Sequence, residues 1–296
     1  MKSSFKQCSC VTIGTLLTVF LSAAQVPAQR LHVTVSIAPQ RYFVEKIGGE
    51  YVDVNVMVPP GADPHTYEPK PRQVVSLAKA RIFFAIGLPF ETGWLDRFRA
   101  VNPEMLIVRT DEGIDKLPSH PEKAEGDGHS HEEYRYDPHV WLSPRLVTRQ
   151  AEHIVRALEE SDPSHADAYR QNYGRFIEEL NELDRYIRSV FQGAEGQLRF
   201  LVFHPSWGYF ARDYGLEQIP IESGGKEPKP AELVSIIDTA KRFNIRVVFV
   251  QPQFSVKSAR VIADAIGGKV VYADDLSQDW DNNMRKTAQQ FKAALR

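Results

Sequence analysis

Two kinds of segment alternate along most of the chain. Short segments rich in Val, Ile and Phe have the length of strands, and the longer segments between them have the spacing of helices. Alternation of this kind predicts parallel sheets with helices on both faces. The predicted strands fall into two groups of four, at 31–37, 52–58, 81–86 and 105–109, and at 199–203, 216–221, 246–250 and 269–272. Helices are expected at 41–47 and 71–79 in the first group, and at 231–243, 256–266 and 283–295 in the second.

The longest helical pattern lies between the two groups, at 164–191. The triplet Ser161-Asp162-Pro163 precedes it as a helix-start signal, and Gly193 follows it. A surface helix of one domain would show the same pattern, but a length of roughly 42 Å and the position between the groups favour a helix that joins two lobes. Its apolar face consists of Tyr169, Tyr173, Phe176, Leu180, Leu183 and Ile187.

These patterns predict an α/β protein of two lobes, each a roughly four-stranded, mainly parallel sheet flanked by helices, joined by one long helix. The predicted boundaries are 29–160 for the N-terminal lobe, 161–193 for the linking helix and 194–296 for the C-terminal lobe. A length of 296 residues also exceeds what one small core usually organises, which favours two domains.

The first residues have the pattern of an export signal. Lys2 and Lys6 form a short basic region, residues 11–24 are apolar and uncharged, and Val26-Pro27-Ala28 is a small-x-small cleavage pattern. The apolar run would make a helix of roughly 21 Å, too short for the roughly 30 Å core of a bilayer. We therefore expect a signal peptide at 1–28 rather than a membrane anchor, and a periplasmic protein cleaved near Ala28.

Cleavage would remove Cys8 and Cys10, which are the two cysteines of the chain. A transition-metal site in the mature protein would then be built from His, Asp, Glu or water. The formal net charge would move from −2 to −4, because the removed segment holds two lysines and no acid. This balance gives no reason to expect nucleic acid or an anionic membrane as a partner.

Residues 118–135 differ in kind from the rest of the chain. They contain His120, His129 and His131 among acidic residues and glycines, with almost no apolar side chain. Such a segment cannot bury enough surface to order itself, so we expect a mobile loop.

Three histidines and one aspartate are the candidate ligands of a metal. His65 and His204 stand at or just after predicted strands, Asp274 follows the last strand, and His139 follows the histidine-bearing loop. Ligands of open α/β sheets gather beyond the carboxyl ends of the strands, so a site between the lobes could use all four. Three imidazoles and a carboxylate suit zinc, although any one of these histidines alone would more often be a surface or core residue.

The segments around these residues resemble the metal-binding solute receptors of zinc and manganese ABC importers, a family that includes surface lipoproteins once called adhesins. The resemblance rests on Gly-Ala-Asp-Pro-His-Thr-Tyr-Glu-Pro at 61–69, Asp-Pro-His-Val-Trp-Leu-Ser-Pro at 137–144 and the segment 204–216, and it covers 31–296. It implies two α/β lobes bridged by a long helix, with the metal held between them by His65, His139, His204 and Asp274. Zinc receptors of the family often carry a long His-rich acidic loop, and 118–135 is a short version of it.

The resemblance implies a high-affinity receptor that delivers Zn²⁺ to an inner-membrane ABC permease and its ATPase, as a monomer and without catalysis. A manganese or iron receptor of the same family is an alternative, although Glu stands in manganese members where this chain has His204. A periplasmic zinc hydrolase is a second alternative, since three histidines and an open water are a catalytic pattern. A carboxylate in the fourth position would close that site, and the chain has no His-Glu-x-x-His helix.

Overall fold

The computed structural model describes residues 30–119, 136–193, 198–222 and 225–295. The predicted signal peptide at 1–28 lies outside these residues, as do His120, His129 and His131 of the predicted loop. Among the described residues, no helix has both the length and the apolar character needed to cross a membrane.

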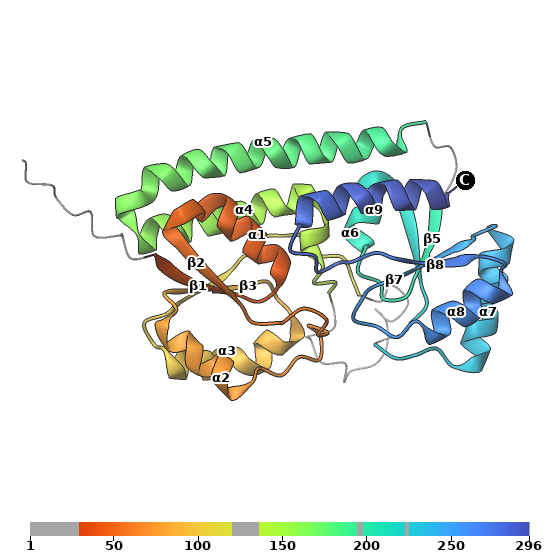
Figure 1. Cartoon of the computed structure of the whole chain (residues 1–296), viewed down its shortest axis with the longest axis horizontal. Coiled ribbons are helices and arrows are strands. Elements are labelled where there is room, and N and C mark those ends of the chain that lie inside the picture. Colours follow the sequence, from red (N-terminus) through yellow and green to blue (C-terminus); the bar gives the residue numbers. More distant parts are fainter. Residues whose placement is uncertain (1–29, 120–135, 194–197, 223–224, 296) are drawn as a thin grey trace, which may run out of the picture.

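Each group of predicted strands forms one fully parallel sheet. The order is β2-β1-β3-β4 in the N-terminal lobe and β6-β5-β7-β8 in the C-terminal lobe, so the two sheets have the same topology. The predicted fold class of two α/β lobes is confirmed (Figure 1). The strands are β1 (Leu31–Val35), β2 (Val52–Val56), β3 (Ile82–Ala85), β4 (Leu106–Arg109), β5 (Leu198–Val202), β6 (Leu216–Pro220), β7 (Val247–Val250) and β8 (Lys269–Tyr272).

Helices flank both sheets, and five of them (α1, α2, α3, α4 and α7) have a proline in the first turn. Proline is tolerated there because the first backbone N–H groups of a helix have no partner within the helix. The helices are α1 (Ala38–Gly48), α2 (Pro71–Ser76), α3 (Pro89–Val101), α4 (Pro144–Ser161), α5 (Ala166–Phe191), α6 (Gly208–Tyr214), α7 (Pro230–Arg242), α8 (Lys257–Ala265) and α9 (Trp280–Ala294).

The long helix predicted between the lobes is α5, which runs along one side of the molecule and reaches over both sheets (Figure 1). It begins at Ala166 because Pro163–His165 forms a separate 3-10 turn. Its buried face includes Tyr169, Phe176 and Leu183, as the spacing predicts. It packs against α1 and α4 of the N-terminal lobe and against α6 and α9 near the C-terminal sheet, so it holds both lobes together.

The last helix, α9, also contacts both lobes, although the sequence pattern places it in the C-terminal lobe alone. At its start the ring of Trp280 lies edge-on to Phe43 of α1, with the ring centroids 5.0 Å apart. Near its end Phe291 stacks on Phe200 of β5 at 4.3 Å. One continuous set of buried side chains therefore runs from the N-terminal sheet to the C-terminal sheet.

Candidate metal centre

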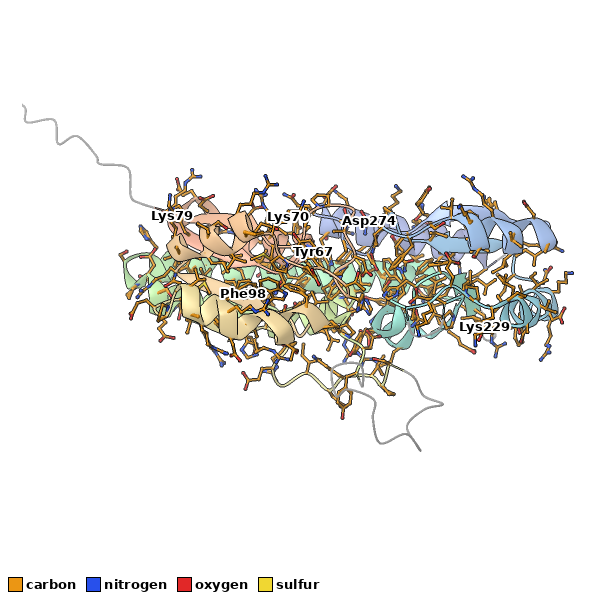
Figure 2. All side chains as sticks on the ribbon, turned by 90° about the horizontal axis from the view of Figure 1, so that it is seen from below. Tyr67, Lys70, Lys79, Phe98, Lys229 and Asp274 are labelled. Atoms are coloured by element: carbon orange, nitrogen blue, oxygen red, sulfur yellow. The ribbon has the colours of Figure 1, made fainter. Side chains whose placement is uncertain are left out.

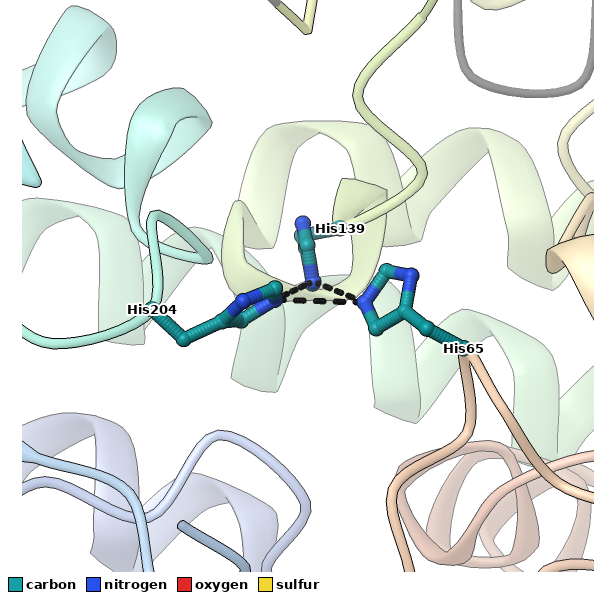
Figure 3. A group of neighbouring side chains, drawn as sticks. All are labelled: His65, His139 and His204. Atoms are coloured by element: carbon teal, nitrogen blue, oxygen red, sulfur yellow. Dashed lines mark hydrogen bonds between the residues drawn. The ribbon is translucent and has the colours of Figure 1, made fainter. Parts of the chain in front are cut away.

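Three histidines from separate parts of the chain meet between the lobes. His65 lies in the segment between β2 and α2, His139 precedes the 3-10 helix Val140–Leu142, and His204 follows β5. Their Nε2 atoms form a nearly equilateral triangle, with sides of 3.1 Å (His65–His139), 3.2 Å (His65–His204) and 3.1 Å (His139–His204) (Figure 3). Among the described residues this is the group of ligand atoms close enough together to hold one metal ion.

The same short turn presents two of these histidines. In Asp63-Pro64-His65 the Asp63 carboxylate accepts the backbone N–H of His65 at 2.9 Å. In Asp137-Pro138-His139 the Asp137 carboxylate accepts the backbone N–H of His139 at the same distance. Asp-Pro commonly begins a turn, and in both segments the turn sets the direction of the histidine that follows.

Buried carboxylates contact the outer ring nitrogen of two histidines. Nδ1 of His139 lies 2.6 Å from Oδ1 of Asp137, and Nδ1 of His204 lies 2.6 Å from Oε1 of Glu222. Both imidazoles are almost completely buried. A carboxylate at Nδ1 keeps the proton on that nitrogen, which leaves the lone pair of Nε2 free to bind a metal.

The surroundings move the pKa values of two histidines in opposite directions. Burial, together with the neighbouring rings of His139 and His204, holds the pKa of His65 well below its usual value. Burial also disfavours the charged form of His204, but the contact with Glu222 and the nearby carboxylate of Asp275 outweigh it and raise the pKa of His204. The metal-free site is therefore arranged to hold a proton on His204 rather than on His65.

The triangle has the right size for zinc. With sides of 3.1–3.2 Å, the three Nε2 atoms are close enough together for one ion with zinc–nitrogen bonds of about 2.0–2.1 Å to bind all three. Zinc in proteins usually has four ligands, so a carboxylate or a water would be the fourth. A set of three imidazoles favours zinc and other late metals over manganese, which prefers oxygen.

The structure does not bring Asp274 into this group. Its Oδ1 accepts the backbone N–H of Leu276 at 2.9 Å, which ties the carboxylate to its own turn. The neighbouring Asp275 is buried, accepts a hydrogen bond from the Gln253 amide at 2.7 Å, and acts through its charge on His204. Figure 2 shows Asp274 near the middle of the long axis, between Lys70 and Lys229. Ligation by Asp274 thus remains a prediction.

A family model described as "Zinc-uptake complex component A periplasmic" matches residues 33–294, nearly all of the chain. The chain belongs to this family. The high-affinity zinc uptake system protein ZnuA of Bacillus subtilis (strain 168) is 30% identical over 259 residues, which are 83% of this chain and 79% of that protein.

Solved structures agree with the family and with the fold. A crystal structure of ZnuA has a TM-score of 0.84 and 45% sequence identity, covering 90% of this chain and 100% of that chain. A ZnuA deletion mutant with zinc bound has a TM-score of 0.82 and 45% identity, covering 90% of this chain and 98% of that chain. The predicted membership of the zinc and manganese receptors of ABC importers is confirmed.

Two residues of the site have roles that the sequence pattern did not reveal. Asp137 lies in a segment that carries the family resemblance, and its contact with the ring of His139 was not predicted. Glu222 was not singled out, although it follows the predicted strand 216–221 at the carboxyl end where ligands gather. The strand-end rule applied to every acidic residue would have found it.

Proposed function

We propose that this chain is a periplasmic receptor that binds Zn²⁺ between its two lobes and delivers it to an inner-membrane ABC permease and its ATPase. The ligands are His65, His139 and His204, with Asp274 as the proposed fourth ligand once its carboxylate releases the N–H of Leu276. The protein acts as a monomer, exported by the signal peptide 1–28 and cleaved near Ala28. Membership of the zinc-uptake family supports this assignment.

The convergence of three Nε2 atoms within 3.2 Å carries the proposal. The same atoms are drawn from both halves of the chain, so the bound ion is enclosed between lobes rather than exposed on one of them. Enclosure suits a carrier, which must hold its cargo through diffusion and give it up only when the site is disturbed. Three imidazole donors also support zinc rather than manganese as the cargo, and zinc lies above ferrous iron in the general order of affinities.

Three histidines are also the ligand set of many catalytic zinc sites. We propose no catalytic activity for this site, for the following reason. A hydrolase needs a general base beside the metal-bound water. The carboxylates of Asp137 and Glu222 that touch this site are engaged at the outer nitrogens of His139 and His204. Turnover of esters or peptides by the zinc-loaded protein, lost on removal of zinc, would revive the enzymatic alternative.

Metal analysis tests the proposal directly. Protein produced without a polyhistidine tag and purified without chelator should contain close to one zinc per chain, and His65→Ala should lose it. His32→Ala is a matched control, because His32 pairs with Asp53 on the surface, away from the triangle. Protein that retains no zinc, or a His65→Ala variant that retains all of it, would contradict the assignment.

A further inference from the structure

A buried carboxylate outside the predicted ligand set stands behind His204. Glu222 is 6% exposed, and its Oε1 lies 2.6 Å from Nδ1 of His204, which is 7% exposed. A buried carboxylate is costly unless it is paired. Since the partner is a histidine whose other nitrogen belongs to the candidate metal triangle, the pair links the sheet of the C-terminal lobe to the metal site.

Strand register places Glu222 at this point. Val202 of β5 is the parallel neighbour of Pro220 in β6. The pairing continues past the strands, because Ile221 donates to the carbonyl of Val202 at 2.9 Å and Glu222 donates to the carbonyl of Phe203 at 3.1 Å. Residue 222 therefore lies beside residue 204 as the next neighbours in the register, and their side chains meet.

Gln251 and Phe254 contact the backbone and the ring face of His204. Among these contacts, only that of Glu222 determines which ring nitrogen carries the proton. The Gln251 side chain accepts the backbone N–H of His204 at 3.2 Å and donates to its carbonyl at 2.6 Å. Phe254 stacks on the imidazole with the ring centroids 5.0 Å apart. Neither contact distinguishes one ring nitrogen from the other, whereas a carboxylate at Nδ1 does.

We propose that Glu222 is a positioning residue for zinc binding, an inference that rests on the proposed function. By accepting a hydrogen bond from Nδ1–H, Glu222 holds His204 in the tautomer that turns the Nε2 lone pair toward the metal. It also supplies negative charge next to a set of three neutral imidazoles, which cannot balance the charge of Zn²⁺ themselves. The Glu222 carboxylate lies behind His204 and would not contact the metal itself. Its charge therefore strengthens zinc binding without adding an oxygen ligand.

Two variants of the full-length mature protein separate these contributions. Glu222→Met removes the acceptor and the charge, and Glu222→Gln removes the charge while the amide can accept from Nδ1 or donate to it. Zn²⁺ affinity, measured by competition with a chromophoric chelator, should fall about 10- to 100-fold in Glu222→Met and by a smaller factor in Glu222→Gln. Glu217→Gln is the matched control in β6, the strand that precedes Glu222, where the Glu217 carboxylate contacts Arg199 at the surface.

A second measurement distinguishes positioning from mere structural support. In the metal-free wild type, at a pH where His204 is neutral, the ¹⁵N shifts of its ring should report a proton on Nδ1, and Glu222→Met should shift the tautomer toward Nε2–H. A lower melting temperature with an unchanged tautomer would indicate a structural role and overturn the proposal. If Glu222→Met fails to fold, the Glu222→Gln variant decides the question. A Zn²⁺ affinity of Glu222→Gln within twofold of the wild type would overturn the positioning role of Glu222. Wild-type protein that binds no zinc would instead refute the proposed function.

Discussion

At the scale of single residues, three identical side chains occupy three different environments. His139 and His204 are each held by a buried carboxylate at 2.6 Å, while His65 lies on a loop after β2 and is less buried than the other two. A ring that is already oriented loses less freedom when it binds a metal. His139 and His204 are therefore the fixed part of the triangle, and His65 completes it.

Replacing His204 should change the choice of metal. His204→Glu exchanges an imidazole for a carboxylate, which manganese prefers, so the ratio of zinc to manganese affinity should fall at least tenfold, about 1.4 kcal/mol. Because the new carboxylate would face Glu222, the comparison is best made in a Glu222→Gln background. Competition at fixed pH measures the ratio.

His153→Glu provides the control for this experiment. His153 lies on the exposed side of α4, where its Nε2 contacts the carbonyl of Glu112 at 3.1 Å. A new carboxylate there adds the same charge at a distance from the triangle, so the ratio should stay as in the wild type. Equal ratios with and without His204→Glu would remove His204 from the ligand set.

Variants of the neighbouring residues Asp274 and Asp275 test which group is the fourth ligand. If Asp274 binds the metal, Asp274→Asn should lower Zn²⁺ affinity at least tenfold. Asp275→Asn should have the smaller effect, because the Asp275 side chain is already occupied by the Gln253 amide. Isothermal titration of both variants with Zn²⁺ measures the difference. A larger loss of Zn²⁺ affinity in Asp275→Asn would make Asp275 the fourth ligand. No loss of affinity in either variant would make water the fourth ligand.

Sequence patterns predict some features of this site and leave others undetermined. The approach of His65, His139 and His204 was predicted from strand ends together with a family resemblance. The partnership of His204 with Glu222 depends on the register between β5 and β6, which no local pattern encodes. The hydrogen bond from the Leu276 N–H to Asp274 is local, but spacing along the chain does not reveal whether it keeps the carboxylate away from the three histidines.

At the scale of elements, the strands and the long helix were predicted because their periodicity is strong, and their ends were less certain. The start of α5 shows why: Pro163 permits either a helix or a 3-10 turn, and the chain forms the turn Pro163–His165 before α5 begins. The double contact of α9 was not predicted, since a single apolar face does not reveal that its first residue packs on one lobe and its last turns on the other.

The role of α5 in holding the lobes together can be measured at Leu183. This side chain is fully buried in the set of apolar residues that the two lobes share. Leu183→Ala should lower the free energy of unfolding by about 2–5 kcal/mol through lost burial and the cavity that remains. Urea denaturation of the metal-free protein measures the change. Asn181→Ala, at an exposed position of the same helix, should change it by less than about 0.5 kcal/mol.

At the scale of the whole molecule, zinc should stabilise the folded state, because the triangle exists only when both lobes are in place. At a free zinc concentration 100 times the dissociation constant the gain is about 2.7 kcal/mol. For a protein of this size the melting temperature should then rise by roughly 5–10 °C. Scanning calorimetry should show this rise in the wild type and its loss in His65→Ala. An identical rise in both proteins would mean that zinc binds elsewhere.

The proton balance of zinc binding follows from the opposite pKa shifts of two histidines. The pKa of His65 is held well below its usual value, so His65 is already neutral near pH 7 and releases no proton when zinc binds. The pKa of His204 is raised, so in the window from about 6.5 up to that raised pKa the metal-free site carries a proton on His204 that zinc must displace. Zinc affinity should therefore increase with pH through this window, with the number of protons released depending on His204 and not on His65. Titration calorimetry near pH 7 in buffers of different ionisation enthalpy measures that number.

The Glu222→Gln variant should release fewer protons on zinc binding, because the Glu222 carboxylate is the main group that raises the pKa of His204. Release of no proton in the wild type would show that His204 is neutral before zinc arrives.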